Sequence, residues 1–145
     1  MKQKILAVAA LTLTLSFNPA ARAQWPGYRG ADAAGIAETK NPPRKLGPES
    51  VKEAWRIMLG NSFSEFAVVG DKALILAMRD KGEALLCLDA GTGKEVWTAP
   101  IDEKTNMDGN GIGPRATPAI RDGKVFACSS FMKLTGHDLA TGREL

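Results

Sequence analysis

Residues 87–97 read CLDAGTGKEVW, and residues 136–145 read GHDLATGREL, which is a shorter copy of the same pattern. The two stretches align at a constant separation of 49 residues. The matching positions hold an aspartate, a threonine, a glycine, a basic residue and a glutamate: Asp89, Thr92, Gly93, Lys94 and Glu95 align with Asp138, Thr141, Gly142, Arg143 and Glu144. Self-similarity at such a period indicates a protein built from structural repeats.

The first copy has the chemistry of a turn between two strands. An apolar run at residues 85–88 precedes it, and residues 95–97 begin a return strand. The side chains of Asp89 and Thr92 can bond nearby backbone N–H groups, and Gly93 can adopt the positive φ that closes a loop of three to five residues. The sequence therefore predicts a β-hairpin around this turn.

The order small residue, x, Asp, x, x, Thr, Gly, Lys, x, x, Trp resembles the blade motif of the PQQ-like, or quinoprotein-type, β-propeller family. In that family the tryptophan docks against the turn of a neighbouring blade, so the resemblance implies a structural role for the motif. The matching residues are Asp89, Thr92, Gly93, Lys94 and Trp97 in the first copy, and Asp138, Thr141, Gly142 and Arg143 in the second. Cys87 and Gly136 stand at the small-residue position, where the family usually has alanine.

The resemblance runs from Trp25 to the end of the chain and implies an all-β fold, a β-propeller of four-stranded antiparallel blades. Turn signals at Gly and Asp clusters separate the expected strands. We expect the first blade at residues 64–69, 72–78, 84–89 and 95–101, and the second at 116–121, 124–129, 133–138 and from 144 onward. Residues 51–59 are expected to form a further outer strand, with Trp55 in the position that Trp97 takes later.

The N-terminus has the features of a secretory signal peptide. Lys2 and Lys4 precede an apolar stretch at residues 5–17, and the triplet at residues 21–23 reads Ala-Arg-Ala. We predict cleavage before Gln24 and a periplasmic or secreted protein. The apolar stretch is too short to span a bilayer, and no transmembrane segment is expected after cleavage.

Three regions follow from these boundaries. Residues 1–23 are the predicted signal peptide, residues 24–50 an N-terminal tail and linker, and residues 51–145 the first blades of an incomplete propeller. Trp25 and Tyr28 are expected to anchor the tail to the folded body.

The charge balance of the chain argues against a nucleic-acid partner. The sequence has 19 Lys and Arg residues against 16 Asp and Glu residues. Residues 1–23 contain three of the basic residues and no acidic ones, so that the rest of the chain holds 16 of each sign. Nucleic-acid binding needs a clustered basic surface, which a neutral chain of this kind does not indicate.

Three motifs that suggest a chemical site are incomplete. GTGK lacks the pattern of a phosphate loop, because Leu88 stands where that loop has a glycine and Glu95 where it has Ser or Thr. The sequence DGNG at residues 108–111 resembles the start of a calcium loop, but Ile112 and Ala119 occupy positions that need oxygen ligands. His137 is the sole histidine of the chain, and no paired nucleophile lies near it in sequence, which favours a strand residue.

The two cysteines, Cys87 and Cys128, occupy non-equivalent places in successive blades. Two buried strand thiols are favoured over a disulfide, although an exported chain permits one. They are not adjacent in sequence, whereas quinoprotein alcohol dehydrogenases of this superfamily carry a ring of neighbouring cysteines over the quinone.

Arg115 is the best visible candidate for contacting an anionic cofactor near the propeller axis. It lies in the loop that enters an innermost strand, and the aligned residue of the preceding blade is Phe63, so that the arginine is not a repeated feature. A solvated loop charge is the favoured alternative.

The expected function is that of a non-catalytic scaffold or binding module for a protein, envelope or carbohydrate partner, with no catalytic residue, cofactor or metal. The alternative is the N-terminal part of a PQQ- and calcium-dependent dehydrogenase whose catalytic residues lie in further blades. Propellers close with about four to eight blades, and this chain supplies about two. We therefore expect the gene to continue past Leu145 with a tryptophan at the next position and further copies of the motif.

Overall fold

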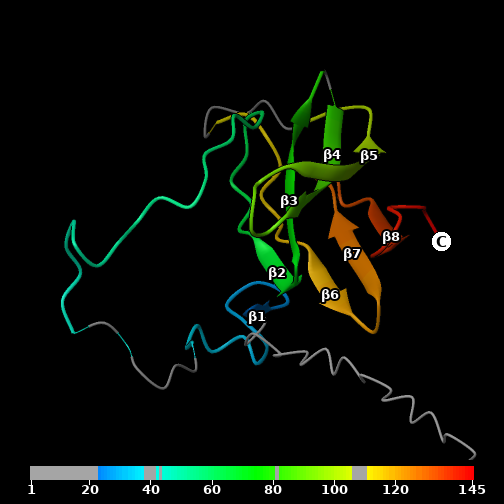
Figure 1. Cartoon of the computed structure of the whole chain (residues 1–145). Helices are drawn as coiled ribbons and strands as arrows, with labels where there is room; N and C mark the ends of the chain where they lie inside the picture. The colour runs from blue at the N-terminus through cyan, green and yellow to red at the C-terminus, as the bar shows by residue number, and fades with distance from the viewer. Residues whose placement is uncertain (1–22, 38–41, 43, 81, 106–110) are drawn as a thin grey trace, which may run out of the picture.

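The computed structural model describes residues 23–37, 42, 44–80, 82–105 and 111–145. Across these residues the regular structure is β-strand alone, arranged in two antiparallel sheets (Figure 1). The strands are β1 (Ala23–Trp25), β2 (Ala67–Gly70), β3 (Lys72–Arg79), β4 (Gly82–Asp89), β5 (Glu95–Asp102), β6 (Ala119–Arg121), β7 (Lys124–Cys128) and β8 (Leu134–Asp138). The described residues contain no helix long and apolar enough to cross a membrane.

The first sheet has the order β1-β2-β3-β4-β5, and each neighbouring pair is antiparallel. The central strands β3 and β4 are apolar along most of their length, because side chains on both faces of this sheet are buried. β5 instead carries exposed and buried positions in turn, which is the pattern of an outer strand with one covered face.

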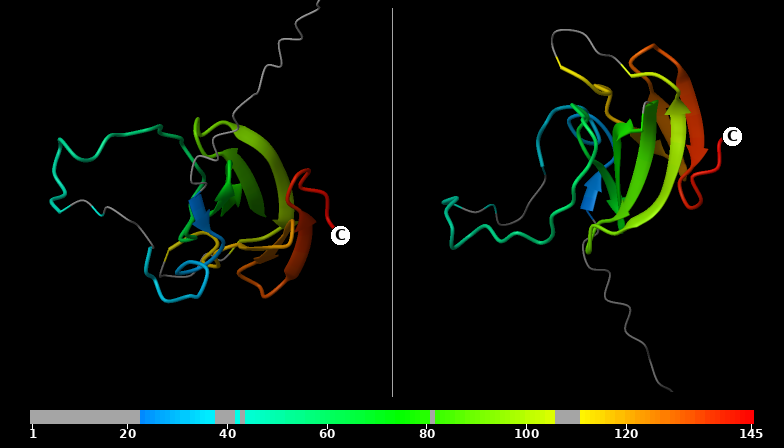
Figure 2. Two further views of the ribbon diagram at one scale, coloured as in Figure 1. Left: turned by 60° about the horizontal axis from the view of Figure 1, so that its bottom comes forward. Right: turned by 90° about the horizontal axis from the view of Figure 1, so that it is seen from above.

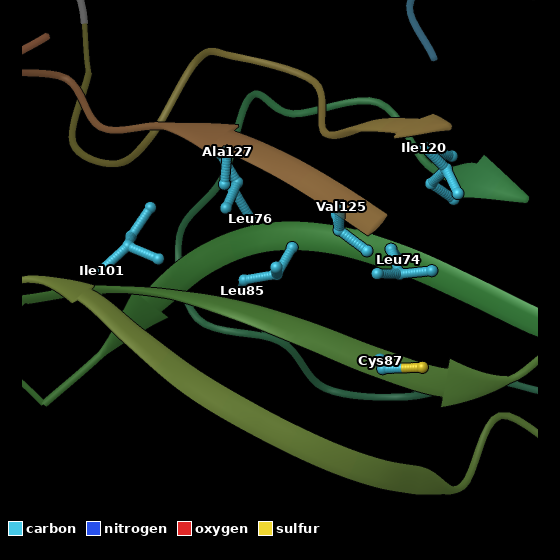
Figure 3. Close-up of a cluster of buried hydrophobic side chains, with 9 residues drawn as sticks. Leu74, Leu76, Leu85, Cys87, Ile101, Ile120, Val125 and Ala127 are labelled. Carbon is cyan, nitrogen blue, oxygen red and sulfur yellow. The ribbon is translucent and has the colours of Figure 1, made fainter. Parts of the chain in front are cut away.

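The second sheet has the order β6-β7-β8 and packs against one face of the first. Figure 2 shows it beside the first sheet, with the long excursion of residues 44–60 on the opposite side. The shared core is drawn in Figure 3; the first sheet contributes Leu74, Leu76, Leu85, Cys87 and Ile101, and the second contributes Ile120, Val125 and Ala127. A fully buried leucine stabilises a fold by roughly 1.5–3 kcal/mol relative to an exposed one, so this core joins the two sheets into one unit.

The other face of the first sheet is covered by the chain segment that precedes β2. Ile75, Ala77 and Leu86 are buried there, and Leu59 and Phe66 pack against them. The buried residues of β3 therefore alternate between two cores, as the period of two in a strand requires.

The expected strands of the first blade are present, and their ends differ from the expected ones by at most three residues. In the second sheet the expected fourth strand is reduced to an isolated bridge between His137 and Glu144. The strand expected at residues 51–59 is not formed in the described structure, where this segment has no strand to pair with. Its side chains hold it in place instead, through Trp55 and Leu59.

The strand β1 was not expected from the sequence, because it has three residues and no alternating pattern. It adds to the edge of β2 and makes a fifth strand of the first sheet. Trp25 lies in this strand and is half-buried, whereas Tyr28 is 67% exposed and does not anchor the tail as expected. The glycine-rich stretch at residues 108–111 falls largely outside the described residues.

Truncating Leu74 to alanine should lower the free energy of unfolding by about 2–5 kcal/mol, because the side chain is fully buried between the two sheets. The matched control is Leu46→Ala, since Leu46 is 77% exposed in the linker and should change the free energy by less than about 0.5 kcal/mol. Urea unfolding followed by circular dichroism measures both values. Equal effects of the two substitutions would contradict the shared core.

Candidate functional site

The repeated motif forms a closed turn stabilised by its own side chains. In the first copy, Oδ1 of Asp89 accepts hydrogen bonds from the backbone N of Thr92 at 2.8 Å and from the Thr92 hydroxyl at 2.7 Å. The backbone N of Gly93 donates to the carbonyl of Asp89 at 2.8 Å, and Gly93 has a φ of 70°. These bonds lower the pKa of the Asp89 carboxyl below its ordinary value, the Thr92 hydroxyl contributing most.

The second copy repeats this geometry. Oδ1 of Asp138 accepts from the backbone N of Thr141 at 2.9 Å and from its hydroxyl at 2.7 Å. The backbone N of Gly142 donates to the Asp138 carbonyl at 2.8 Å, and Gly142 has a φ of 75°. The pKa of Asp138 is lowered for the same first cause, the hydrogen bond from the Thr141 hydroxyl. Both aspartates are therefore engaged in local turns.

Each of these turns carries a tryptophan from another part of the chain. The indole Nε1 of Trp97 donates to the carbonyl of Leu139 at 3.2 Å. A β-carbon built on Gly142 would lie 2.6 Å from Cε3 of Trp97, so a side chain at this position would clash with the ring. The glycine thus serves both the positive φ of the turn and the close approach of the ring. Because Trp97 lies on β5 and Gly142 follows β8, the contact joins the two sheets.

Trp55 makes the same contact with the first turn. Its Nε1 donates to the carbonyl of Ala90 at 2.9 Å, and a β-carbon on Gly93 would lie 2.6 Å from Cδ2 of the ring. The ring of Trp55 also meets that of Phe66 edge-on, with centroids 6.3 Å apart. Residues 51–59 have no strand pairing in the described chain, but Trp55 fixes them against the first turn as Trp97 fixes β5 against the second.

A buried polar cluster forms a second connection between the sheets. Glu83, on β4, is 1% exposed, and its Oε1 accepts hydrogen bonds from the hydroxyls of Thr105 at 2.9 Å and Ser130 at 2.5 Å. Its Oε2 accepts from the backbone N of Ser130 at 3.0 Å. Beside it, the Ser129 hydroxyl donates to Oδ2 of Asp102 at 2.7 Å, and this bond is the main cause of a lowered pKa at Asp102.

Sequence reasoning did not single out Glu83. The available signal was a lone acidic residue at the start of an otherwise apolar strand, and its meaning depends on Ser130, which lies 47 residues later. Ser129 and Ser130 lack around them the sequence pattern of a hydrolytic nucleophile. Their hydroxyls instead donate to the carboxylates of the other sheet.

His137 is buried within the second sheet and braces the turn that follows it. Its Nδ1 lies 3.1 Å from the carbonyl of Gly142, and its Nε2 lies 3.0 Å from the Thr135 hydroxyl. Since a carbonyl only accepts, Nδ1 carries a hydrogen. Both ring nitrogens therefore serve the fold, as expected of a strand residue.

The two cysteines are free thiols, as favoured from the sequence. Cys87 is fully buried on β4, opposite Trp97 in the sheet register, and burial raises the pKa of its thiol to about 11. Cys128 is half-buried at the end of β7, and its Sγ lies 3.6 Å from the carbonyl of Ser129. A thiol that stays protonated at neutral pH, as Cys87 does, is a poor nucleophile.

The structure places Arg115 against its own loop and against Phe63. The guanidinium carbon lies 5.1 Å from the centroid of the Phe63 ring, and its nitrogens donate to the carbonyls of Gly111 at 3.3 Å and Gly113 at 3.5 Å. Phe63 also lines a shallow hollow of about 340 Å³ together with Asn61, Ser62 and Ile112. Arg115, in the segment before β6, thus contacts its aligned residue Phe63, in the segment before β2.

These residues do not fit a quinone held with calcium. PQQ is a planar molecule with several carboxylates, so its site needs cations directed at the ligand and a flat apolar contact on each face. Arg115 directs nitrogens at loop carbonyls, and no cation lines the neighbouring hollow, which is formed by Asn61, Ser62, Phe63 and Ile112 among the described residues. Among the residues that the structure describes, no three His, Cys, Asp or Glu side chains gather as a metal site would require.

A second hollow lies between the turns of the two sheets and has a volume of about 440 Å³. One side is formed by β1 and the turn between β2 and β3, and the other by the turn between β6 and β7 and the turn that follows β8. Its lining residues are Gln24, Val69, Gly70, Asp71, Lys72, Gly123, Asp138, Leu139 and Ala140.

Residues 44–145 match the model of a PQQ repeat family described as outer membrane protein assembly factor BamB. Among curated proteins, no sequence matches the chain. The matched residues include both turn motifs, both docked tryptophans and the polar cluster between the sheets.

Replacing Trp97 with alanine should lower the free energy of unfolding by about 3–5 kcal/mol, since the indole fills the surface of the Gly142 turn and its Nε1 bonds Leu139. Thermal and urea unfolding measure the change. The control is Val96→Ala, one residue earlier on the same strand, where the side chain is 53% exposed. A Trp97→Ala protein with the melting temperature of the wild type would contradict the role of the contact.

The stability of the fold should fall in acid as the turn aspartates protonate. A lowered pKa in the folded state means that the carboxylate contributes stability above the ordinary Asp pKa of about 3.9, and that this contribution is lost as the pH falls through the folded pKa. Thr92→Val removes the hydroxyl donor to Asp89 and should raise the pKa of that carboxyl. NMR titration measures it, with Asp138 as the unchanged internal reference; a fixed Asp89 pKa would exclude the hydroxyl as the cause.

Proposed function

The chain belongs to the PQQ-like repeat family, and we propose that it is an exported scaffold or binding module without catalytic activity. In this proposal its two sheets are successive blades of a β-propeller, and its loops present a binding surface at the cell envelope. One observation carries the proposal: the side chains that could act as nucleophiles or bases instead make hydrogen bonds that hold the repeats together.

That use extends over several types of group. The hydroxyls of Ser129 and Ser130 donate to the carboxylates of Asp102 and Glu83, and His137 bonds the turn at Gly142. A nucleophile or general base must be free to meet a substrate, and each of these groups is occupied by the fold. The arrangement therefore supports binding through surfaces better than chemistry at these residues.

The propeller arrangement is supported by the two turns, because a tryptophan docks on each of them in the same way. Trp55 docks on the Gly93 turn as Trp97 docks on the Gly142 turn, so residues 51–59 take the place of the outer strand of a neighbouring blade. In the proposed ring, this segment pairs with inner strands of another blade and closes the circle. Closed radial repetition is one way in which all-β proteins protect their sheet edges.

A protein partner is the most specific form of the proposal. The family model that matches residues 44–145 carries the name of an outer membrane protein assembly factor, which is a role in assembling other proteins. Export into the envelope, predicted from residues 1–23, would bring this chain to the same compartment. Long loops on a rigid frame, such as the one after β5, are suitable binding elements.

Two experiments test the proposal, a titration of the full-length protein with PQQ and a deletion of its gene. Calorimetric titration with PQQ, with and without calcium, should show no saturable binding, whereas a saturable quinone site would overturn the scaffold assignment in favour of the dehydrogenase. Deleting the gene should lower the amount of protein assembled in the outer membrane. Complementation with a protein carrying Arg115→Ala should restore that amount, since the arginine has no catalytic role in the proposal. Unchanged levels of outer membrane proteins after deletion would contradict the assembly role.

A further inference from the structure

The N-terminal segment occupies the inner edge of the first sheet. Strand β1 pairs antiparallel with β2 in a register that places Ala23 opposite Gly70, Gln24 opposite Val69 and Trp25 opposite Val68. Figure 1 shows this segment beneath β2 and next to β6. We call residues 23–30 the N-terminal clasp.

The clasp also bonds the second sheet. The carbonyl of Pro26 accepts a hydrogen bond of 2.7 Å from the backbone N of Ile120, in the middle of β6. A β-carbon on Gly27 would lie 3.7 Å from the carbonyl of Pro118, so the backbones are in contact there. The clasp therefore spans the inner strands of both sheets.

A tight turn fixes the far end of the clasp. Gly30 has a φ of 85°, is buried, and donates its backbone N to the carbonyl of Gly27 at 3.0 Å. The ring of Trp25 lies against Gly30, and an added β-carbon would approach its Cζ3 to 3.0 Å. The backbone N of Arg29 also donates to Oε2 of Glu65 at 3.3 Å. The clasp is thus held by backbone and side-chain contacts along its length.

The bond at which the signal peptide is predicted to be removed, Ala23–Gln24, lies inside β1. A protease binds its substrate as an extended chain and needs several residues on each side of the bond, so a strand that is paired in a sheet must first lift away. We propose that docking of the clasp shields this bond, and that the leader must therefore be removed before the clasp closes. This inference rests on the export that the proposed function includes.

The cut leaves most of the clasp intact. After cleavage, Gln24 and Trp25 keep their partners Val69 and Val68 on β2, and Pro26 keeps its bond to Ile120. Gln24 lines the hollow of about 440 Å³, so water in that hollow can solvate the new α-amino group. Removal of the leader is therefore compatible with the docked clasp, provided that it comes first.

Limited trypsin digestion of the full precursor tests the shielding. Trypsin cleaves after Arg22, and the residues that must enter its active site beyond that bond are the three residues of β1. Mass spectrometry follows the initial rate at which the product beginning at Ala23 appears. The test variant is Gly30→Ala, which places a side chain against Trp25 at a positive φ, and the control is Gly47→Ala, where an added β-carbon meets nothing within 4 Å.

The Gly30→Ala precursor should be cut about tenfold faster than the wild type, because loosening the clasp raises the population of its open form. The Gly47→Ala precursor should be cut at the wild-type rate. Hydrogen exchange at the Ile120 amide supplies a second readout, with protection expected in the wild type and reduced protection in Gly30→Ala while the β3 and β4 amides stay protected.

Equal cleavage rates for all three precursors would overturn the shielding, as would an Ile120 amide that exchanges like an unstructured peptide in the wild type. The export proposal fails by a different result. Protein taken from the producing cell should begin at Gln24, and a mass that includes Met1 would refute export, whatever the trypsin rates are.

Discussion

The indole of Trp97 on the Gly142 turn is the interaction on which the assembly of the repeats depends. Two demands meet at this glycine: the turn needs a positive φ, and the ring needs a surface without a side chain. A side chain at this position would clash with the ring and would also be strained at a positive φ, which ties the local turn to the packing of the sheets. Trp55 packs on the Gly93 turn in the same way. The contact between an indole and a turn glycine therefore recurs in successive parts of the chain.

The polar cluster around Glu83 adds directional bonds to this apolar contact. A buried carboxylate is costly unless its oxygens are satisfied, and here hydroxyls and a backbone N–H from loops on both sides satisfy them. Within the described residues, no buried side-chain nitrogen or oxygen lacks a partner. These hydrogen bonds restrict the position of one sheet relative to the other, because a shift of either sheet would change the donor–acceptor distances.

The sequence was sufficient to predict the elements that depend on local chemistry. The turns at Asp89 and Asp138 follow from an aspartate, a threonine and a glycine at fixed spacing, and the apolar runs of β3 and β4 predict buried strands. The fold family could be inferred from the same residues. The bonds of Glu83 could not, because they join residues 47 positions apart and nothing local to either one indicates the partner. β1 was missed for a similar reason: its three residues become a strand because the edge of β2 is there to pair with.

The indole contact is independent of the length of chain that it encloses. Trp55 and its carbonyl partner are 35 residues apart, and Trp97 and its partner are 42 apart. A β-carbon built on either turn glycine would nevertheless lie 2.6 Å from the ring. The extra residues are accommodated in connections such as the one between β5 and β6. Loop length and loop chemistry can therefore vary without disturbing the junctions that stabilise the fold. A frame of this kind allows a lineage to acquire a new binding specificity by exchanging loops, while the stability of the protein stays nearly constant.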